Sequence, residues 1–214
     1  SSGFLSRASS MLFAEAQAGQ TYNIFGIRFS QYVKFDADYR IYYKLNKTNT
    51  LALRGFGGLA IPYGNSAVMP FDKRYSVGGS NDMRAWKFRS LGPGTYSDSL
   101  SFDKTGDISL IASAEYRFPV ISYLQSALFI DAGNIWTIKE YTDFPGGKFN
   151  LSSFYKQIAI GSGIGLRLDF GFFVFRVDAA VPIVDPAREI GDKWLGLSDY
   201  RKRINLNFGI GYPF

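Results

Sequence analysis

Residues 70–86 read PFDKRYSVGGSNDMRAW, and they lie in a long segment without a strand-like repeat, from about residue 62 to residue 106. On both sides of this segment the chain alternates apolar and polar residues. Loops of this length inside a compact protein are uncommon, and they are usually functional or disordered. Because this one holds aromatic residues and a Gly-Gly pair rather than low-complexity sequence, we expect it to be ordered and packed on a surface that the rest of the chain provides.

Eight segments of the chain alternate apolar and polar residues with the period of a β-strand. The first of them is the weakest, and the other seven are regular. The expected strands are residues 4–18, 31–44, 50–61, 107–120, 124–136, 157–170, 172–183 and 204–214. Runs of this length are typical of membrane-crossing strands, which have about 9–11 residues, whereas strands of soluble sheets average about 5–6.

The two faces of these segments differ in chemistry. In the sixth segment, for example, Ile164 and Leu168 alternate with Arg167 and Asp169. An apolar face that ends in aromatic residues, opposite a charged face, is typical of a membrane barrel with a polar interior. We expect lumen-facing side chains at Arg40, Arg54, Glu115, Arg117, Arg167, Asp169, Arg176 and Asp178, and lipid-facing ones at Leu110, Ile160, Phe175 and Phe208. A soluble β-sheet protein is the alternative, because it also alternates.

The composition excludes several classes of site. The chain has 214 residues and contains neither cysteine nor histidine, so disulfides, thiolate metal sites and imidazole chemistry are excluded within it. We expect no enzyme activity, no catalytic residue, no metal and no cofactor. The net charge is +6, but the basic residues are scattered except for Arg201, Lys202 and Arg203, and no binding motif accompanies them. No nucleic-acid partner is therefore expected.

Two motifs and the end of the chain resemble the BamA/TamA family of outer-membrane assembly proteins. Residues 78–86, GGSNDMRAW, are similar to the loop-six motif of the family, although Ala85 stands where the family usually has glycine. Residues 129–133, FIDAG, resemble the strand motif whose aspartate receives the loop arginine. Three further stretches resemble the TamA-like, lipid-anchored branch (TamL): residues 89–94 (RSLGPG), 115–119 (EYRFP) and 209–214 (GIGYPF).

The resemblance covers nearly the whole chain, but only the second half of the family's barrel, which has 16 strands and follows periplasmic POTRA domains. We therefore expect residues 1–214 to be the C-terminal eight strands of an all-β, antiparallel transmembrane barrel. The long loop, residues 62–106, would fold into the lumen. The POTRA domains and the first half of the barrel would be absent from this chain. An eight-stranded barrel is filled by its own side chains and has no space for such a loop.

The function that the resemblance implies is the insertion or translocation of other outer-membrane or surface proteins in the outer membrane of a Gram-negative cell. Expected partners are outer-membrane lipid, unfolded client proteins, and further chain or subunits that complete the barrel. Alternatives from other classes stay open. They are a passive pore, a transporter that secretes a single partner protein, and a small structural eight-stranded barrel.

The candidate site is a contact between the loop and the barrel wall, formed by Arg84 and Asp131 as the resemblance implies. A guanidinium can bind a carboxylate bidentately and so fix both position and orientation. Glycines in the loop would let its backbone approach the wall closely, and the tryptophan would pack on the wall or lie in an interfacial aromatic band. The loop-motif residues are Gly78, Gly79, Ser80, Asn81 and Trp86.

The last segment is expected to be a weak closing strand. Proline cannot donate a ladder hydrogen bond and glycine weakens a strand, so pairing should thin toward Phe214. A weakly paired strand would form a seam that opens sideways. The residues assigned to this seam and to a C-terminal assembly signal are Phe208, Gly209, Gly211, Tyr212, Pro213 and Phe214.

Overall fold

The computed structural model describes residues 23–24, 27–97, 104–189, 191–195 and 200–214. The expected strand at residues 4–18 lies outside the described residues. Among those that are described, no helix combines the length and apolar character needed to cross a membrane.

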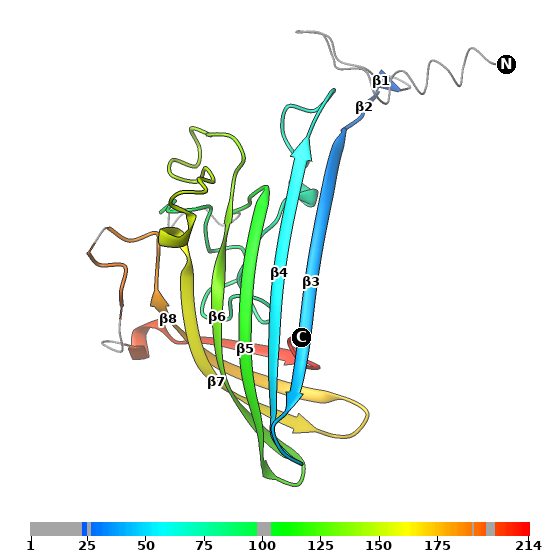
Figure 1. Cartoon of the computed structure of the whole chain (residues 1–214), viewed down its shortest axis with the longest axis vertical. Coiled ribbons are helices and arrows are strands. Elements are labelled where there is room, and N and C mark those ends of the chain that lie inside the picture. The colour runs from blue at the N-terminus through cyan, green and yellow to red at the C-terminus, as the bar shows by residue number, and fades with distance from the viewer. Residues whose placement is uncertain (1–22, 25–26, 98–103, 190, 196–199) are drawn as a thin grey trace, which may run out of the picture.

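One antiparallel sheet of seven strands forms the body of the described chain, and each strand lies beside its neighbours in sequence (Figure 1). The strands are β3 (Tyr32–Lys44), β4 (Thr50–Pro62), β5 (Ile108–Ile121), β6 (Leu124–Trp136), β7 (Ala159–Asp169), β8 (Val174–Val184) and β9 (Asn205–Ile210). Two short strands, β1 (Asn23–Ile24) and β2 (Ile27–Arg28), pair separately, and three 3-10 helices lie in loops: η1 (Phe71–Lys73), η2 (Phe154–Gln157) and η3 (Tyr200–Arg203). The sheet confirms the predicted all-β, antiparallel fold class.

The connections alternate between short turns at one end of the sheet and long loops at the other (Figure 1). In the turn after β3, the Asn46 side chain accepts hydrogen bonds from the main-chain nitrogens of Thr48 and Asn49, at 2.9 and 2.7 Å. In the turn after β7, Gly171 has a φ of 81°, which glycine adopts without strain. These local signals fix the hairpins, and the hairpins fix the register of the strands.

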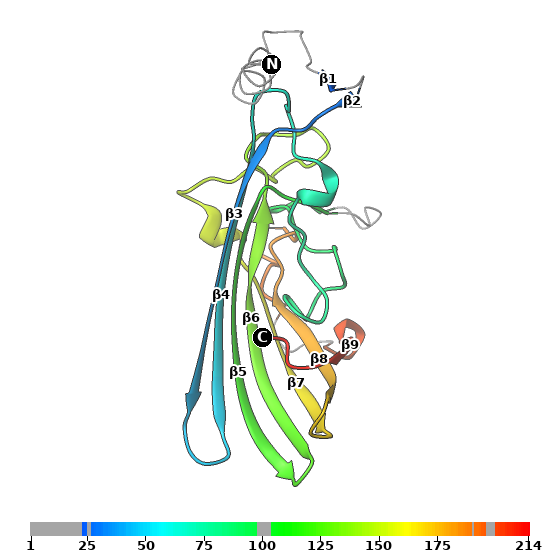
Figure 2. The same ribbon diagram turned by 90° about the vertical axis from the view of Figure 1, so that its right-hand side faces the viewer.

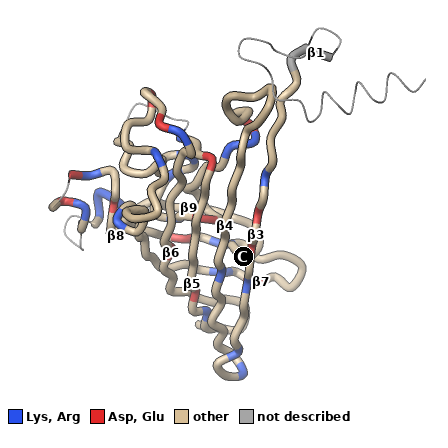
Figure 3. Tube along the Cα trace, turned by 45° about the horizontal axis from the view of Figure 1, so that its top comes forward, with Lys and Arg blue, Asp and Glu red and all other residues tan. Residues whose placement is uncertain are grey.

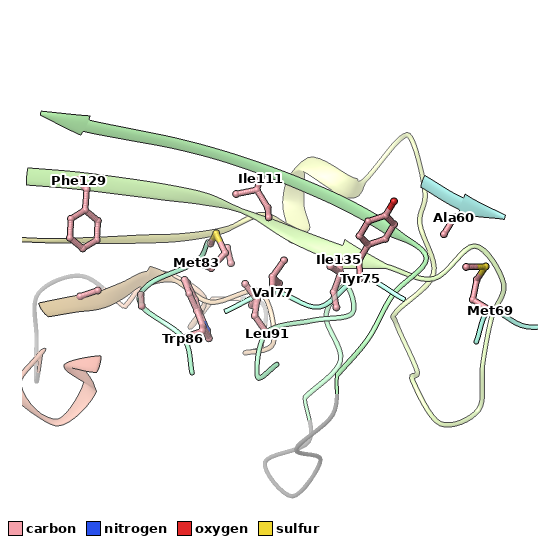
Figure 4. Packing of buried hydrophobic residues seen from close by; sticks show 13 residues of the cluster. Ala60, Met69, Tyr75, Val77, Met83, Trp86, Leu91, Ile111, Phe129 and Ile135 are labelled. Carbon is pink, nitrogen blue, oxygen red and sulfur yellow. The ribbon is translucent and has the colours of Figure 1, made fainter. Parts of the chain in front are cut away.

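The long loop between β4 and β5 covers one face of the sheet (Figure 2). Its apolar side chains pack on the wall in a single cluster that joins loop residues to Ile111, Phe129 and Ile135 (Figure 4). The loop members of this cluster are Met69, Tyr75, Val77, Met83, Ala85, Trp86 and Leu91. The covered face is the one on which alternation placed the charged residues of the strands.

The charged residues that were expected to face the lumen lie mostly under this loop. Glu115, Arg117, Arg167, Arg176 and Asp178 are buried, and Figure 3 shows the charged positions along strands and loops. Phe208, on the opposite face, is exposed, while Leu110, Ile160 and Phe175 are half-buried. Asp169 differs from the other charges, because its carboxylate accepts a hydrogen bond from the main-chain nitrogen of Gly171 at 2.8 Å and so belongs to the turn.

The predicted last strand, residues 204–214, was too long. The structure ends β9 at Ile210, and Gly211, with a φ of 83°, turns the chain. After this turn Tyr212 and Phe214 lie against the Arg117 guanidinium on the covered face, although strict alternation placed both on the apolar face. A left-handed glycine interrupts the two-residue period, and alternation cannot be extrapolated through it.

Candidate functional site

The loop motif forms a closed turn that presents Arg84 to the wall. The main-chain nitrogen of Gly79 donates to the Trp86 oxygen at 2.8 Å, and the Trp86 nitrogen donates to the Met83 oxygen at 3.0 Å. Gly78 and Gly79 have φ values of 111° and 94°. A Cβ atom on Gly78 would overlap the main-chain oxygen of Lys87. The Gly-Gly pair is therefore required by the backbone path of this turn.

Arg84 and Asp131 are in contact, and the contact has three hydrogen bonds. The Nε and Nη2 atoms of Arg84 donate to Oδ2 and Oδ1 of Asp131, both at 2.9 Å. The main-chain nitrogen of Arg84 also donates to Oδ2, at 3.2 Å. The Arg84 guanidinium carbon lies 3.4 Å from the centre of the Phe129 ring, an arrangement that cation–π attraction favours. Both charged side chains are 1% exposed, so the pair is held away from water.

Glu115 of β5 is a second carboxylate partner of Arg84. Its Oε2 atom lies 2.5 Å from Nη1 of Arg84 and 3.2 Å from Nη2 of Arg167, and its Oε1 atom lies 2.8 Å from Nε of Arg117. One carboxylate thus joins three guanidiniums. The Arg84–Asp131 pair is one edge of a larger buried network, which the sequence motifs did not indicate.

The network continues toward the last strands through Asp178 of β8. Arg167 donates to Asp178 at 2.6 Å, and Arg176 lies 3.5 Å from the same carboxylate. Glycine provides the space for these groups, because a Cβ atom on Gly165 would collide with both Arg167 and Asp178. The buried side chains of the network are Arg84, Arg117, Arg167, Arg176, Glu115, Asp131 and Asp178.

Trp86 packs on the inner wall, and the wall is shaped to receive it. A Cβ atom on Gly161 of β7 would lie 2.5 Å from the Cβ atom of Ala85 and 3.1 Å from the Trp86 ring. Gly161 therefore accommodates the alanine at the position where the BamA/TamA loop motif usually has glycine. Sequence reasoning did not single out Gly161, because the signal lies in a glycine-rich strand face that alternation alone explains.

The remaining residues of the loop motif contact strands on both sides of the Arg84–Asp131 pair. Oδ1 of Asn81 accepts from Nη2 of Arg176 at 2.9 Å, and the main-chain oxygen of Asn81 accepts from Nη1 of Arg54 at 2.9 Å. Asp82 pairs with Arg54 at 3.1 Å. Ser80 is half-buried beside them. The motif therefore spans from β4 to β8 across the covered face.

The electrostatics of the loop reflect its burial. Burial raises the pKa of the Asp82 carboxyl above its usual range, although the positive charge of Arg54 opposes the shift. Burial also disfavours the charged form of Arg84, but its hydrogen bonds to Asp131 and the charges of Asp131 and Glu115 outweigh this and raise its pKa. Arg84 is thus a permanent cation whose position depends on these carboxylates.

The last strand and the residues after it also contact the network. Nδ2 of Asn205 and Nδ2 of Asn207 both donate to the main-chain oxygen of Arg84, at 2.9 and 2.8 Å. Nη2 of Arg117 donates to the main-chain oxygen of Phe214 at 3.0 Å. Of the residues assigned to the seam, Phe208 points away from the loop and Gly209 lies over the Arg176 guanidinium.

Comparison with known proteins identifies the family to which the chain is similar. Residues 4–214 match the Omp85 superfamily domain. The outer membrane protein assembly factor BamA of Neisseria meningitidis serogroup B (strain ATCC BAA-335 / MC58) is 33% identical over 110 residues, which cover 48% of this chain and 14% of that protein.

A solved structure of a BamA protein shows a similar fold. BamA from Haemophilus ducreyi lacking POTRA domains 1–3 superposes with a TM-score of 0.57 and 23% identity, over 84% of this chain and 34% of that chain. CdiB from Acinetobacter baumannii superposes with a TM-score of 0.49 and 18% identity, over 86% of this chain and 27% of that one. This chain therefore spans about a third of the Haemophilus chain and 14% of the length of the Neisseria protein.

Proposed function

The chain belongs to the Omp85 superfamily, and from this premise we propose that it is part of a factor that inserts or translocates other proteins in the outer membrane. The family and the Neisseria relative place the chain in the Gram-negative outer membrane. The factor would act without enzymatic chemistry, on unfolded outer-membrane or surface proteins. Its lipid partner would contact the apolar face of the sheet, where Leu128, Ile164 and Phe208 are exposed.

The proposal assigns residues 1–214 to the C-terminal half of a 16-stranded barrel, preceded by POTRA domains and the first eight strands. One edge of β3 and one edge of β9 have no strand partner among the described residues. Phe71 and Phe88 of the loop are also exposed on the covered side. Strands from a longer chain or a partner subunit would pair with these edges and enclose the loop. The finer assignment, to the TamA-like lipid-anchored branch, rests on residues 89–94, 115–119 and 209–214.

The observation that carries the proposal is the short pairing of the last strand. β9 pairs with β8 over six residues, from Asn205 to Ile210, whereas β7 pairs with β8 from Ile160 to Asp169 and with β6 along its other edge. A free strand edge is a template for another strand. We propose that the seam beside β9 opens sideways and that an incoming client strand pairs there, while Arg84 and Asp131 hold the loop on the wall.

The test is a reversible crosslink across the seam of the full-length protein. This chain has no cysteine, so one cysteine in β9 and one in the first strand of the complete barrel would form a defined disulfide. The crosslinked protein, reconstituted in lipid vesicles, should lose insertion of an unfolded barrel client, and reduction should restore it. A matched disulfide between Ala114 and Ile130, which face each other in β5 and β6, should leave insertion unchanged.

Two outcomes would favour the other functions. Full client insertion with the seam closed would argue against lateral opening. Ion flux without insertion of any client would indicate a passive pore, and export of one dedicated protein would indicate a single-partner transporter.

A further inference from the structure

The main-chain oxygen of Arg84 is the point where the loop and the last strand meet. It accepts hydrogen bonds from Nδ2 of Asn205 and from Nδ2 of Asn207, at 2.9 and 2.8 Å. The two asparagines are two residues apart in β9, so their side chains lie on the same face of the strand. One carbonyl group therefore holds two successive inward side chains of the strand that borders the proposed seam.

The position of this carbonyl depends on the side chain of the same residue. The Arg84 guanidinium is bound by Asp131 and Glu115, and the Arg84 main-chain nitrogen also donates to Asp131. Because these three contacts hold both the guanidinium and the main-chain nitrogen of Arg84, its carbonyl group has little freedom to move. The charged contacts that seat the loop on β5 and β6 therefore also set the place at which β9 is held.

The two amide bonds add to a short ladder and to the contacts that Tyr212 and Phe214 make with Arg117 just after β9. Its ladder to β8 extends over six residues, and its other edge has no partner among the described strands. A second hydrogen bond joins the loop to β8, in which Nη2 of Arg176 donates to Oδ1 of Asn81. Each hydrogen bond contributes a net of about 1 kcal/mol, which is comparable to a ladder bond. Loss of both amide bonds would therefore weaken the attachment of so short a strand.

We propose that Asn205 and Asn207 are positioning residues that couple the loop to the seam. While Arg84 is seated on Asp131 and Glu115, its carbonyl holds β9 against β8. When the loop leaves the wall, both amide bonds are lost together, and β9 then depends on its short ladder to β8 and on the contacts of Tyr212 and Phe214 with Arg117. The coupling rests on the proposed function, because it describes how the seam of such a factor would be kept closed.

The test is amide hydrogen exchange of β9 in the full-length protein in lipid nanodiscs. The double variant Asn205→Leu with Asn207→Leu removes both donors at nearly constant side-chain volume. We expect exchange in residues 205–210 to become about tenfold faster or more, with the loop turn at residues 79–86 unchanged. No change in β9 exchange would overturn the proposal.

Asn134 provides a matched control. Its Nδ2 atom donates to the main-chain oxygens of Gly94 and Gln157, at 2.8 and 2.6 Å, so it also ties the loop to the wall, but from β6 and without touching β9. Asn134→Leu should leave β9 exchange unchanged. Equal acceleration by this control would mean that any loosening of the loop opens β9, and the specific role of the two asparagines would be wrong.

A cycle with Arg84→Ala tests the coupling itself. In the Arg84→Ala background the carbonyl loses the guanidinium anchors and keeps only the main-chain hydrogen bond to Asp131, so adding the two asparagine changes should alter β9 exchange less than twofold. Multiplicative effects would show that the loop contact and the β9 contacts act independently. If the double variant does not fold, Asn205→Ala alone, at a half-buried position, gives the same comparison with a smaller effect.

Client insertion by the unsubstituted protein separates the two proposals. Absence of insertion would contradict the proposed function, while the exchange measurements would still decide the coupling. Normal insertion together with unchanged β9 exchange in the double variant would overturn the coupling alone.

Discussion

The centre of the wall and the last strand hold the same loop residue in different ways. On the wall, β5 and β6 bind the side chain of Arg84 through Glu115 and Asp131, in a buried and charged contact between strands that are paired on both edges. On the seam side, β9 binds the carbonyl of Arg84 through two neutral amides, from a strand of six residues. Charge-assisted hydrogen bonds are about twice as strong as neutral ones.

This difference separates a fixed part of the molecule from a part that is suited to move. A buried charged group cannot easily leave its partners, because each would remain unpaired in a dry environment. A neutral amide that separates from a carbonyl loses only a modest net energy. The predictions below test whether the wall and the seam differ in this way.

The largest effect is expected from removal of Asp131. The variant Asp131→Ala leaves the Arg84 guanidinium with Glu115 and, at 4.0 Å, Asp178, and breaking a buried pair costs about 3–5 kcal/mol. We expect the loop to detach, which hydrogen exchange in residues 79–86 of the full-length protein would detect, while barrel abundance in the membrane falls less than client insertion. Slow, unchanged exchange in the loop would contradict the anchoring role of this carboxylate.

A charge swap sharpens this prediction. Arg84→Asp with Asp131→Arg restores an opposite pair, but it also places a new carboxylate beside Glu115, which lies 2.5 Å from Arg84. We therefore expect the swap to recover only a small part of the loss in client insertion. Substantial recovery would indicate that the Arg84–Asp131 pair acts alone, without the wider network.

A smaller effect is expected from Glu115→Gln. The amide keeps the shape of the side chain but removes the charge that three guanidiniums share, and hydrogen bonds to charged groups contribute about 1.5–3 kcal/mol. Urea unfolding of the full-length protein in lipid vesicles should show a loss of about 2–3 kcal/mol. A value within about 0.5 kcal/mol of the unsubstituted protein would show that the arginines find other partners.

A steric change at Gly161 should be milder again. The added methyl group of Gly161→Ala would approach the Cβ atom of Ala85 to 2.5 Å, and overpacking of this kind costs about 1–3 kcal/mol. The second change Ala85→Gly should restore loop protection in the hydrogen exchange experiment. Failure of this rescue would mean that the methyl–methyl contact is not what Gly161 avoids.

The smallest effect is expected at the edge of the sheet. Arg40 pairs with Asp38 at 2.8 Å, but its side chain is 44% exposed among the described residues. Exposed pairs contribute about 0–1 kcal/mol, so Arg40→Ala should hardly change loop exchange or client insertion. This variant is the matched arginine control for Arg84→Ala, and a comparable loss from both would remove the distinction between the wall and the edge.

Much of the sheet follows from local signals. The predicted bounds of β6, residues 124–136, coincide with the structure, and those of β3, β4 and β5 differ from it by one residue at most. Alternation also placed Glu115, Arg167 and Asp178 on the covered face. The pairing of Arg84 with Asp131 was expected from the family motifs. It was not expected from alternation, which identifies a face but not a partner.

The sequence by itself determined most of the strands and their faces, because each depends on residues near one another in the chain. Only the tertiary structure decided which groups share Glu115, why Gly161 stands opposite Ala85, and how Asn205 and Asn207 reach the Arg84 carbonyl. Apart from the Arg117–Glu115 pair, these contacts join residues more than 30 positions apart. Their geometry depends on strand register, loop path and the turn at Gly211 together. A two-residue period carries no information about that combination.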